Sequence, residues 1–132
     1  MAVILVAEDE PFILEVAQFV IEDMGHQSIL ARDVAEALTC LRASQPIDAL
    51  FTDIRLKTEI LGGYELAQHA RRLRPRLAVL YASGNSSTDK TKALFVEGAH
   101  FVQKPYSEQQ LKNALEDLFA VPAELTRSTP SP

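Results

Sequence analysis

The sequence predicts an α/β fold with a doubly wound parallel sheet at its centre. Short apolar runs alternate along the chain with segments whose apolar residues recur at helical spacing, and this alternation is typical of repeated βα units. The runs are almost continuously apolar, as strands covered by helices on both faces are. With 132 residues, 47% of them hydrophobic, the chain is long enough to form one domain with its own core.

Five strands are predicted, because five of the apolar runs are short and end in polar or turn-forming residues. They are Val3–Ala7, Gln27–Ala31, Ala49–Thr52, Leu77–Ala82 and His100–Gln103. A helical segment follows each strand, so consecutive strands are joined by crossovers, which are right-handed in almost all proteins. The strands therefore form one parallel sheet with helices on both faces.

Five helices are predicted from residues that favour helix starts and stops. Proline suits the first helical turn, and aspartate or serine can accept hydrogen bonds from the free N–H groups there. Glycine, or a following proline, ends a helix. The helices fall between Pro11 and Gly25, between Asp33 and Pro46, from about Tyr64 to Leu73 before Pro75, between Ser86 and Gly98, and after Ser107. Residues 121–132 have three prolines and no apolar period, so we expect a domain over residues 2–120 and a flexible tail.

Composition and charge exclude several classes of function. The formal net charge is −5 and the pI is about 5.1, so we expect no direct nucleic-acid binding, which needs a basic surface. The single cysteine, Cys40, excludes an intrachain disulfide and a cysteine metal site and favours a reducing compartment. No apolar run approaches the roughly 18 residues of a membrane span, and the start lacks a basic region with a cleavage site. We expect a cytoplasmic protein without membrane contact.

Three acidic residues follow two of the predicted strands. Glu8 and Asp9 come directly after the first strand, and Asp53 comes after the third. Ligand sites in parallel sheets lie outside the carboxyl ends of the strands, so we expect these carboxylates to share one crevice. At about 5 Å each pair repels by roughly 3 kcal/mol, and Mg²⁺, which prefers oxygen ligands, would relieve this. Lys104, after the fifth strand, adds the charge that makes the cluster with Mg²⁺ neutral, and such a site can hold a phosphoryl group on a carboxylate.

These residues belong to four motifs, which are E-D-E-P at 8–11, L-F-T-D-I-R-L at 50–56, Y-A-S-G at 81–84 and G-A-H-F-V-Q-K-P-Y at 98–106. In this order and spacing, the motifs resemble the receiver domain of two-component response regulators over about residues 2–120. Each motif is weak alone, but an acidic pair, an aspartate, a serine and a Lys-Pro at four strand ends are together specific. The resemblance implies the flavodoxin-like strand order 2-1-3-4-5 of chemotaxis-regulator-like receivers.

The resemblance also implies a phosphoryl-transfer site. Asp53 would be the phosphoacceptor and would attack phosphorus in line. Asp9 would ligate Mg²⁺ directly, Glu8 would do so directly or through water, and the backbone carbonyl of Arg55 would be a further ligand. Lys104 would pair first with Asp53 and then with a phosphoryl oxygen.

A conformational switch is implied by the same resemblance. The Ser83 hydroxyl would move to a phosphoryl oxygen, and the ring of Phe101 would turn inward when it does. Arg55 and Asn85 stand where the family tunes the rate of dephosphorylation, and the Lys104–Pro105 peptide is often cis in the family. The sequence departs from the family in the stretch 57–63, which is longer than the common loop and begins with a lysine where proline is usual.

We therefore expect a stand-alone receiver that takes a phosphoryl group from a sensor histidine kinase or a histidine phosphotransferase. A part of a longer kinase or regulator, with the proline-rich end as the start of a linker, stays open as an alternative. It would not be an enzyme beyond its own phosphorylation and autodephosphorylation. Output would be phosphorylation-dependent contact with a downstream protein target, while a relay or sink role and a phosphorylation-dependent homodimer stay open. Phe12, Leu14 and Ile21 are candidates for a partner surface, because exposed apolar patches mark such sites. The stripe of the last helix is expected to pack in the core: Leu111, Leu115, Leu118 and Phe119.

Other interpretations of the same residues stay open. Asp9 alone could cap the first helix, Ser83 could belong to a turn, Phe101 could be a core residue and Lys104 a surface lysine. An interaction module that is never phosphorylated would share the fold. A Mg²⁺-dependent phosphohydrolase fits less well, because Arg55 stands where its second aspartate would be. A serine hydrolase fits poorly, because Y-A-S-G-N lacks the first glycine of the nucleophile elbow.

Overall fold

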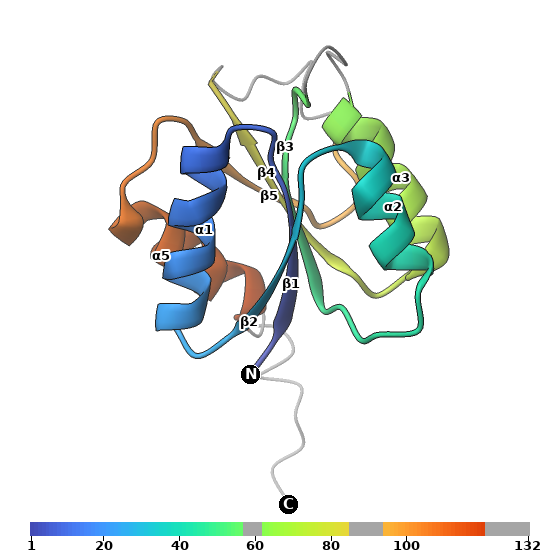
Figure 1. Ribbon diagram of the computed structural model, residues 1–132, viewed down its shortest axis with the longest axis horizontal. Helices are drawn as coiled ribbons and strands as arrows, with labels where there is room; N and C mark the ends of the chain where they lie inside the picture. Colours follow the sequence, from blue (N-terminus) through green and yellow to red (C-terminus); the bar gives the residue numbers. More distant parts are fainter. Residues whose placement is uncertain (57–61, 85–93, 121–132) are drawn as a thin grey trace, which may run out of the picture.

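A five-stranded parallel sheet forms the centre of the computed structural model, which describes residues 1–56, 62–84 and 94–120 (Figure 1). The strands are β1 (Val3–Ala7), β2 (Gln27–Ala31), β3 (Ala49–Asp53), β4 (Ala78–Ser83) and β5 (His100–Gln103). The helices within these residues are α1 (Pro11–Asp23), α2 (Val34–Arg42), α3 (Gly62–Leu73) and α5 (Glu108–Phe119).

The strand order is β2-β1-β3-β4-β5, and every neighbouring pair is parallel. The predicted doubly wound sheet with order 2-1-3-4-5 is therefore confirmed. Helices α1 and α5 cover one face of the sheet, and α2 and α3 cover the other (Figure 1). Because all strands run the same way, their carboxyl ends meet at one edge. The register pairs Ala7 with Thr52 and Asp53 with Ala82, which brings the end of β3 between the ends of β1 and β4.

Two apolar layers hold the helices to the sheet, and successive residues of β1 contribute to each in turn. Leu5 and Ala7 pack with α2 and α3, whereas Ile4 and Val6 pack with α1 and α5. Strands buried on both faces explain the almost continuous apolar runs in the sequence, and each large side chain buried in this way contributes about 1.5–3 kcal/mol. The stripe of α5 packs in the second layer, as predicted, with Leu111 and Leu115 fully buried and Leu118 and Phe119 at its margin.

The helix ends follow from the predicted boundary residues. Pro11 is the first residue of α1, and Gly25, with φ +85°, follows its last turn in a conformation that costs glycine little. Asp33 caps α2 by accepting a hydrogen bond from a first-turn N–H at 2.8 Å. Ser107 forms a capping box with Gln110 at the start of α5, which satisfies two N–H groups that the helix itself leaves free.

The predicted and observed bounds agree closely. β1, β2 and β5 have the predicted bounds, β3 is one residue longer, β4 is shifted by one residue, and α3 begins at Gly62 rather than near Tyr64. Five helices were predicted, and the described residues contain four. Most of the helix predicted between Ser86 and Gly98 lies outside them, and its predicted end was wrong, because residues 94–98 form turns rather than a helix. The predicted tail also lies outside. No helix in the described part of the chain is long and apolar enough to cross a membrane.

Candidate functional site

The three predicted carboxylates meet at the carboxyl edge of the sheet. Glu8 and Asp9 follow β1, and Asp53 is the last residue of the neighbouring strand β3. One oxygen from each carboxylate lies within 4.8 Å of the other two. Glu8 and Asp53 are only 4% and 9% exposed. At this separation and an effective dielectric of about 20, two carboxylates repel by roughly 3.5 kcal/mol, so the fold concentrates negative charge here at a cost.

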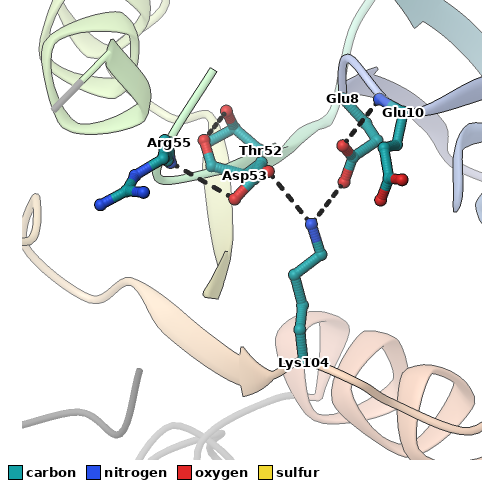
Figure 2. A network of polar contacts seen from close by, with 6 residues as sticks. All are labelled: Glu8, Glu10, Thr52, Asp53, Arg55 and Lys104. Carbon is teal, nitrogen blue, oxygen red and sulfur yellow. Dashed lines mark hydrogen bonds and ion pairs between the residues drawn. The ribbon is translucent and has the colours of Figure 1, made fainter. Parts of the chain in front are cut away.

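Lys104 lies between two of these carboxylates (Figure 2). It follows β5, and its Nζ donates to Glu8 Oε1 at 2.9 Å and to Asp53 Oδ2 at 3.1 Å. Its backbone N–H donates to the carbonyl oxygen of Ser83 at 2.7 Å, which fixes the chain where it leaves β5. The Lys104–Pro105 peptide is cis, in agreement with the family resemblance.

Each of these two carboxylates also accepts a hydrogen bond from a backbone N–H two residues further along the chain. Glu8 Oε2 accepts from Glu10 at 3.1 Å, and Asp53 Oδ1 accepts from Arg55 at 3.3 Å (Figure 2). Hydrogen bonds to ionised carboxylates are among the stronger ones in proteins. With one oxygen on Lys104 and the other on the backbone, both side chains are held in a defined orientation.

Burial sets the electrostatics of the site. Burial raises the pKa of the Asp53 carboxyl, although the charge and hydrogen bond of Lys104 oppose the shift. Burial also raises the pKa of the Glu8 carboxyl, against the hydrogen bonds from the Glu10 N–H and from Lys104. Burial alone would lower the pKa of Lys104, but its hydrogen bonds with the two carboxylates and their charges outweigh this, so the pKa is raised. The ammonium group of Lys104 therefore stays protonated. Ionisation of the Glu8 and Asp53 carboxyls costs free energy, and a further cation beside them would lower that cost.

The donor set suits Mg²⁺. Carboxylate oxygens are the hard ligands that this ion prefers, and Glu8, Asp9 and Asp53 bring three of them together. When all are ionised, three negative charges and the one positive charge of Lys104 leave two negative charges, which a divalent cation neutralises. The backbone carbonyl of Arg55, two residues after Asp53, belongs to the same edge of the sheet.

One site residue that the sequence analysis missed is Gly63, the second residue of α3. Its N–H donates to the carbonyl oxygen of Ile54 at 2.8 Å. A Cβ at this position would lie 2.7 Å from the Cα of Ile54 and would collide with the carbonyl oxygen of Asp53. Helix α3 approaches the backbone of Asp53 this closely because residue 63 has no side chain. The signal in the sequence was the glycine pair at 62–63, since glycine is unfavourable inside a helix without such a reason.

The predicted switch residues lie on the next two strands. Ser83 ends β4, next to the end of β3, and is half-buried. Phe101, on β5, is also half-buried, and its ring stacks on Phe95 with centroids 6.1 Å apart and planes at 20°. Arg55 is exposed beside the carboxylates. Asn85 and residues 57–61 of the long loop lie outside the described residues.

A cleft of about 540 Å³ opens beside Lys104. It is lined by residues of α1 and of the loops after β4 and β5, among them Phe12, Ile13, Val16, Gly84, Pro105 and Tyr106. Phe12 is 75% exposed, as expected for a partner surface. The prediction was wrong for Leu14 and Ile21, which are 6% and 0% exposed, because they lie on the side of α1 that packs on the sheet.

Comparisons with known proteins agree with this geometry. The family model described as response regulator receiver domain matches residues 4–116. The nitrogen assimilation regulatory protein NtrX of Azorhizobium caulinodans is 33% identical over 120 residues, 87% of this chain and 26% of NtrX. The crystal structure of a response regulator receiver protein from Sinorhizobium medicae has a TM-score of 0.79 and 27% identity, and the match covers 89% of this chain and 93% of that one.

The same fold recurs at lower identity. The chemotaxis response regulator CheY4 of Vibrio cholerae has a TM-score of 0.79 at 22% identity, with 90% of this chain and 99% of that chain covered. Three of the curated relatives are longer proteins, since the match covers 26%, 45% and 48% of their length. The matched part of these relatives is therefore one region of a larger protein.

Proposed function

Because the chain belongs to the response regulator receiver domain family, we propose that it is a phosphoacceptor signalling domain of a two-component system. Asp53 accepts the phosphoryl group, and the donor is a phosphorylated histidine of a sensor histidine kinase or a histidine phosphotransferase. The observation that carries the proposal is the contact of Lys104 with both Glu8 and Asp53, beside Asp9. A charged lysine within a cluster of buried carboxylates supports a site that takes up further negative charge.

In the proposed reaction, a carboxylate oxygen of Asp53 attacks the donor phosphorus in line with the departing imidazole nitrogen. A P–O bond to Asp53 forms, the P–N bond breaks, and the donor histidine keeps the bonding electrons and takes up a proton. The acyl phosphate makes the cluster more negative by about one charge. Lys104 then pairs with a phosphoryl oxygen while Glu8, 2.9 Å from its Nζ, remains as its second anchor.

Mg²⁺ would be held by the carboxylates of Asp9 and Asp53 and by the backbone carbonyl of Arg55. When bound, it would supply positive charge to the oxygens of the transferring phosphoryl group. Glu8 would bind it directly or through water. Both Glu8 oxygens already accept one hydrogen bond each, Oε1 from Lys104 and Oε2 from the N–H of Glu10, and each oxygen keeps a second lone pair that could ligate the ion.

Phosphorylation would act through Ser83 and Phe101. The Ser83 hydroxyl would donate to a phosphoryl oxygen, the ring of Phe101 would turn inward, and a two-state equilibrium would shift. Arg55 and Asn85 would set the rate of autodephosphorylation. The chemistry at Asp53 is confined to its own phosphorylation and dephosphorylation, so we propose no turnover of a small-molecule substrate.

The proposed partners are proteins. The exposed ring of Phe12 and the cleft beside Lys104 support docking of the phosphoryl donor next to the site, because exposed apolar surface marks protein contacts. The output is contact with a downstream protein, or a homodimer, that depends on phosphorylation. We propose no direct contact with nucleic acid, because such binding needs a basic surface and the net charge of the chain is −5. A cytoplasmic location goes with the proposal, since the single Cys40 suits a reducing compartment.

Intact mass after incubation with acetyl phosphate tests the proposal. The wild type is expected to gain about 80 Da, one phosphoryl group, only when Mg²⁺ is present. Asp53→Asn should lose the gain, and Glu15→Gln, which neutralises an exposed acid of α1, should keep it. An adduct that persists in Asp53→Asn would contradict the assignment. Partner binding that ignores phosphorylation would instead favour an interaction module, and turnover of a small phosphate ester would favour a phosphohydrolase.

A further inference from the structure

Four aromatic rings form a continuous cluster on β4, α3, β5 and the segment before β5. Tyr81 of β4 faces Tyr64 of α3, with ring centroids 5.3 Å apart and planes at 61°. Phe95 lies 4.5 Å from Tyr81 and 5.9 Å from Tyr64. Phe101 stacks on Phe95 at 6.1 Å and is the register partner of Tyr81 in the sheet. The ring at the predicted switch position is therefore packed into this aromatic cluster of Tyr64, Tyr81, Phe95 and Phe101.

Tyr81 ties the aromatic cluster to the backbone. Its side chain is fully buried, and burial raises the pKa of its hydroxyl. The hydroxyl oxygen accepts a hydrogen bond from the Val96 N–H at 3.1 Å. Because Val96 directly follows Phe95, this bond fixes the backbone that carries the Phe95 ring.

Tyr64 is a second buried tyrosine in the same cluster, with 4% exposure. Within the residues that the structure describes, its hydroxyl makes no hydrogen bond, and its contacts with Tyr81 and Phe95 are made by the ring. Of these two tyrosines, only Tyr81 accepts a hydrogen bond from a backbone N–H, that of Val96, within the described residues.

We propose, on the basis of the proposed function, that Tyr81 is a positioning residue of the switch. Its hydrogen bond to Val96 holds Phe95 where it supports Phe101 in the unphosphorylated arrangement. Protein interiors are close-packed, so one ring cannot move inward unless its neighbours shift. A shift of Phe95 carries Val96 with it and breaks the bond to Tyr81. The bond thus favours the unphosphorylated arrangement, and its loss shifts the equilibrium toward the phosphorylated one.

A pair of tyrosine variants separates the hydroxyl from the ring. Tyr81→Phe removes the hydroxyl that holds Val96 and keeps the ring, and Tyr64→Phe is the matched control. Amide hydrogen exchange at Val96 in the unphosphorylated protein measures the bond itself. Beryllium fluoride with Mg²⁺, a mimic of a phosphoryl group on a carboxylate, measures the equilibrium through its dissociation constant. Thermal unfolding of the three proteins checks that each is folded.

We expect Tyr81→Phe to speed exchange at Val96 by about five-fold and to tighten beryllium fluoride binding by a similar factor, as one ordinary hydrogen bond would. Tyr64→Phe should change neither. Faster exchange with unchanged beryllium fluoride affinity would overturn the inference, because the bond would then be equally strong in both arrangements. Unchanged exchange at Val96 would overturn it as well. If the wild type fails to bind beryllium fluoride with Mg²⁺, the proposed function itself fails, and the switch role of Tyr81 falls with it.

Discussion

Replacing Asp53 with asparagine should stabilise the metal-free protein, although it removes an ion-pair partner of Lys104. The Asp53 carboxylate lies within 4.8 Å of oxygens of Glu8 and Asp9 and 3.1 Å from Lys104 Nζ. At an effective dielectric of about 20, the two repulsions sum to roughly 7 kcal/mol and the attraction to roughly 5 kcal/mol. The net repulsion is on the order of 2 kcal/mol, and the burial that raises the pKa of Asp53 disfavours its charge in the same direction.

Water reduces this figure, because Asp9 is only half-buried. We expect Asp53→Asn to raise the free energy of unfolding by about 1–2 kcal/mol. Thermal unfolding in the presence of a chelator measures this as a rise in Tm of about 3–8 °C for a domain of this size. Glu15→Gln is the control, because it changes the net charge equally at an exposed position of α1 and should stay within about 0.5 kcal/mol of the wild type.

Added Mg²⁺ should reduce the difference in Tm between Asp53→Asn and the wild type. The cation relieves the repulsion that the asparagine has already removed, so the wild type gains more from it. A chelated Asp53→Asn protein that melts below the wild type would refute the reasoning. It would mean that the attraction of Lys104 for Asp53 exceeds the two repulsions and the cost of burial together.

The stabilisation by Asp53→Asn should shrink as the pH falls, and unfolding from pH 7 down to 4 measures it. A carboxyl whose pKa is raised in the fold imposes its full penalty only above that raised value, and none below its ordinary value of 3.8, where it is protonated in both states. Gly63→Ala should cost about 1–3 kcal/mol of stability and slow the phosphorylation of Asp53 by acetyl phosphate, because its Cβ collides with the Asp53 carbonyl. Gly84→Ala, where nothing lies within 4 Å, should be close to neutral in thermal unfolding. Ser107→Ala should cost about 1 kcal/mol by removing the N-cap of α5, and Ser107→Thr should restore most of it.

Each of these expectations has a result that would contradict it. If the free energy of unfolding of Asp53→Asn exceeds that of the wild type by the same amount at every pH, the charge of Asp53 is not the cause of the stabilisation. Equal losses for the two glycine variants would show that the close approach at Gly63 is unimportant. A Ser107→Ala protein as stable as the wild type would show that the capping box adds nothing measurable.

The place of the site could be predicted because it depends on strand ends. Glu8, Asp9 and Asp53 directly follow apolar runs, and parallel strands bring such positions to one edge of a sheet. Lys104 was predicted to lie in this cluster and to pair with Asp53, but its second contact, with Glu8, could not be predicted, because it depends on side-chain length and orientation. The close approach at Gly63 depends on where α3 sits on the sheet, which no local pattern gives.

Helical spacing also failed to assign the exposed side of α1 in full. Leu14 and Ile21 lie partly off the main apolar stripe in the sequence, yet both are buried, because the buried arc of α1 is wider than that stripe. The predicted exposure of Phe12 was correct. Tyr81 fits an apolar strand pattern as a core residue, and its bond to Val96 depends on a chain segment that reaches it only in the folded sheet.

The position of the phosphoryl group tests the central claim most directly. The chain is phosphorylated with acetyl phosphate, treated with borohydride, which reduces an acyl phosphate to an alcohol, and digested for peptide mass spectrometry. We expect homoserine at position 53 alone, and only when Mg²⁺ was present during phosphorylation. Reduction at Glu8 or Asp9 with Asp53 unmodified would contradict the assignment of Asp53 as the phosphoacceptor.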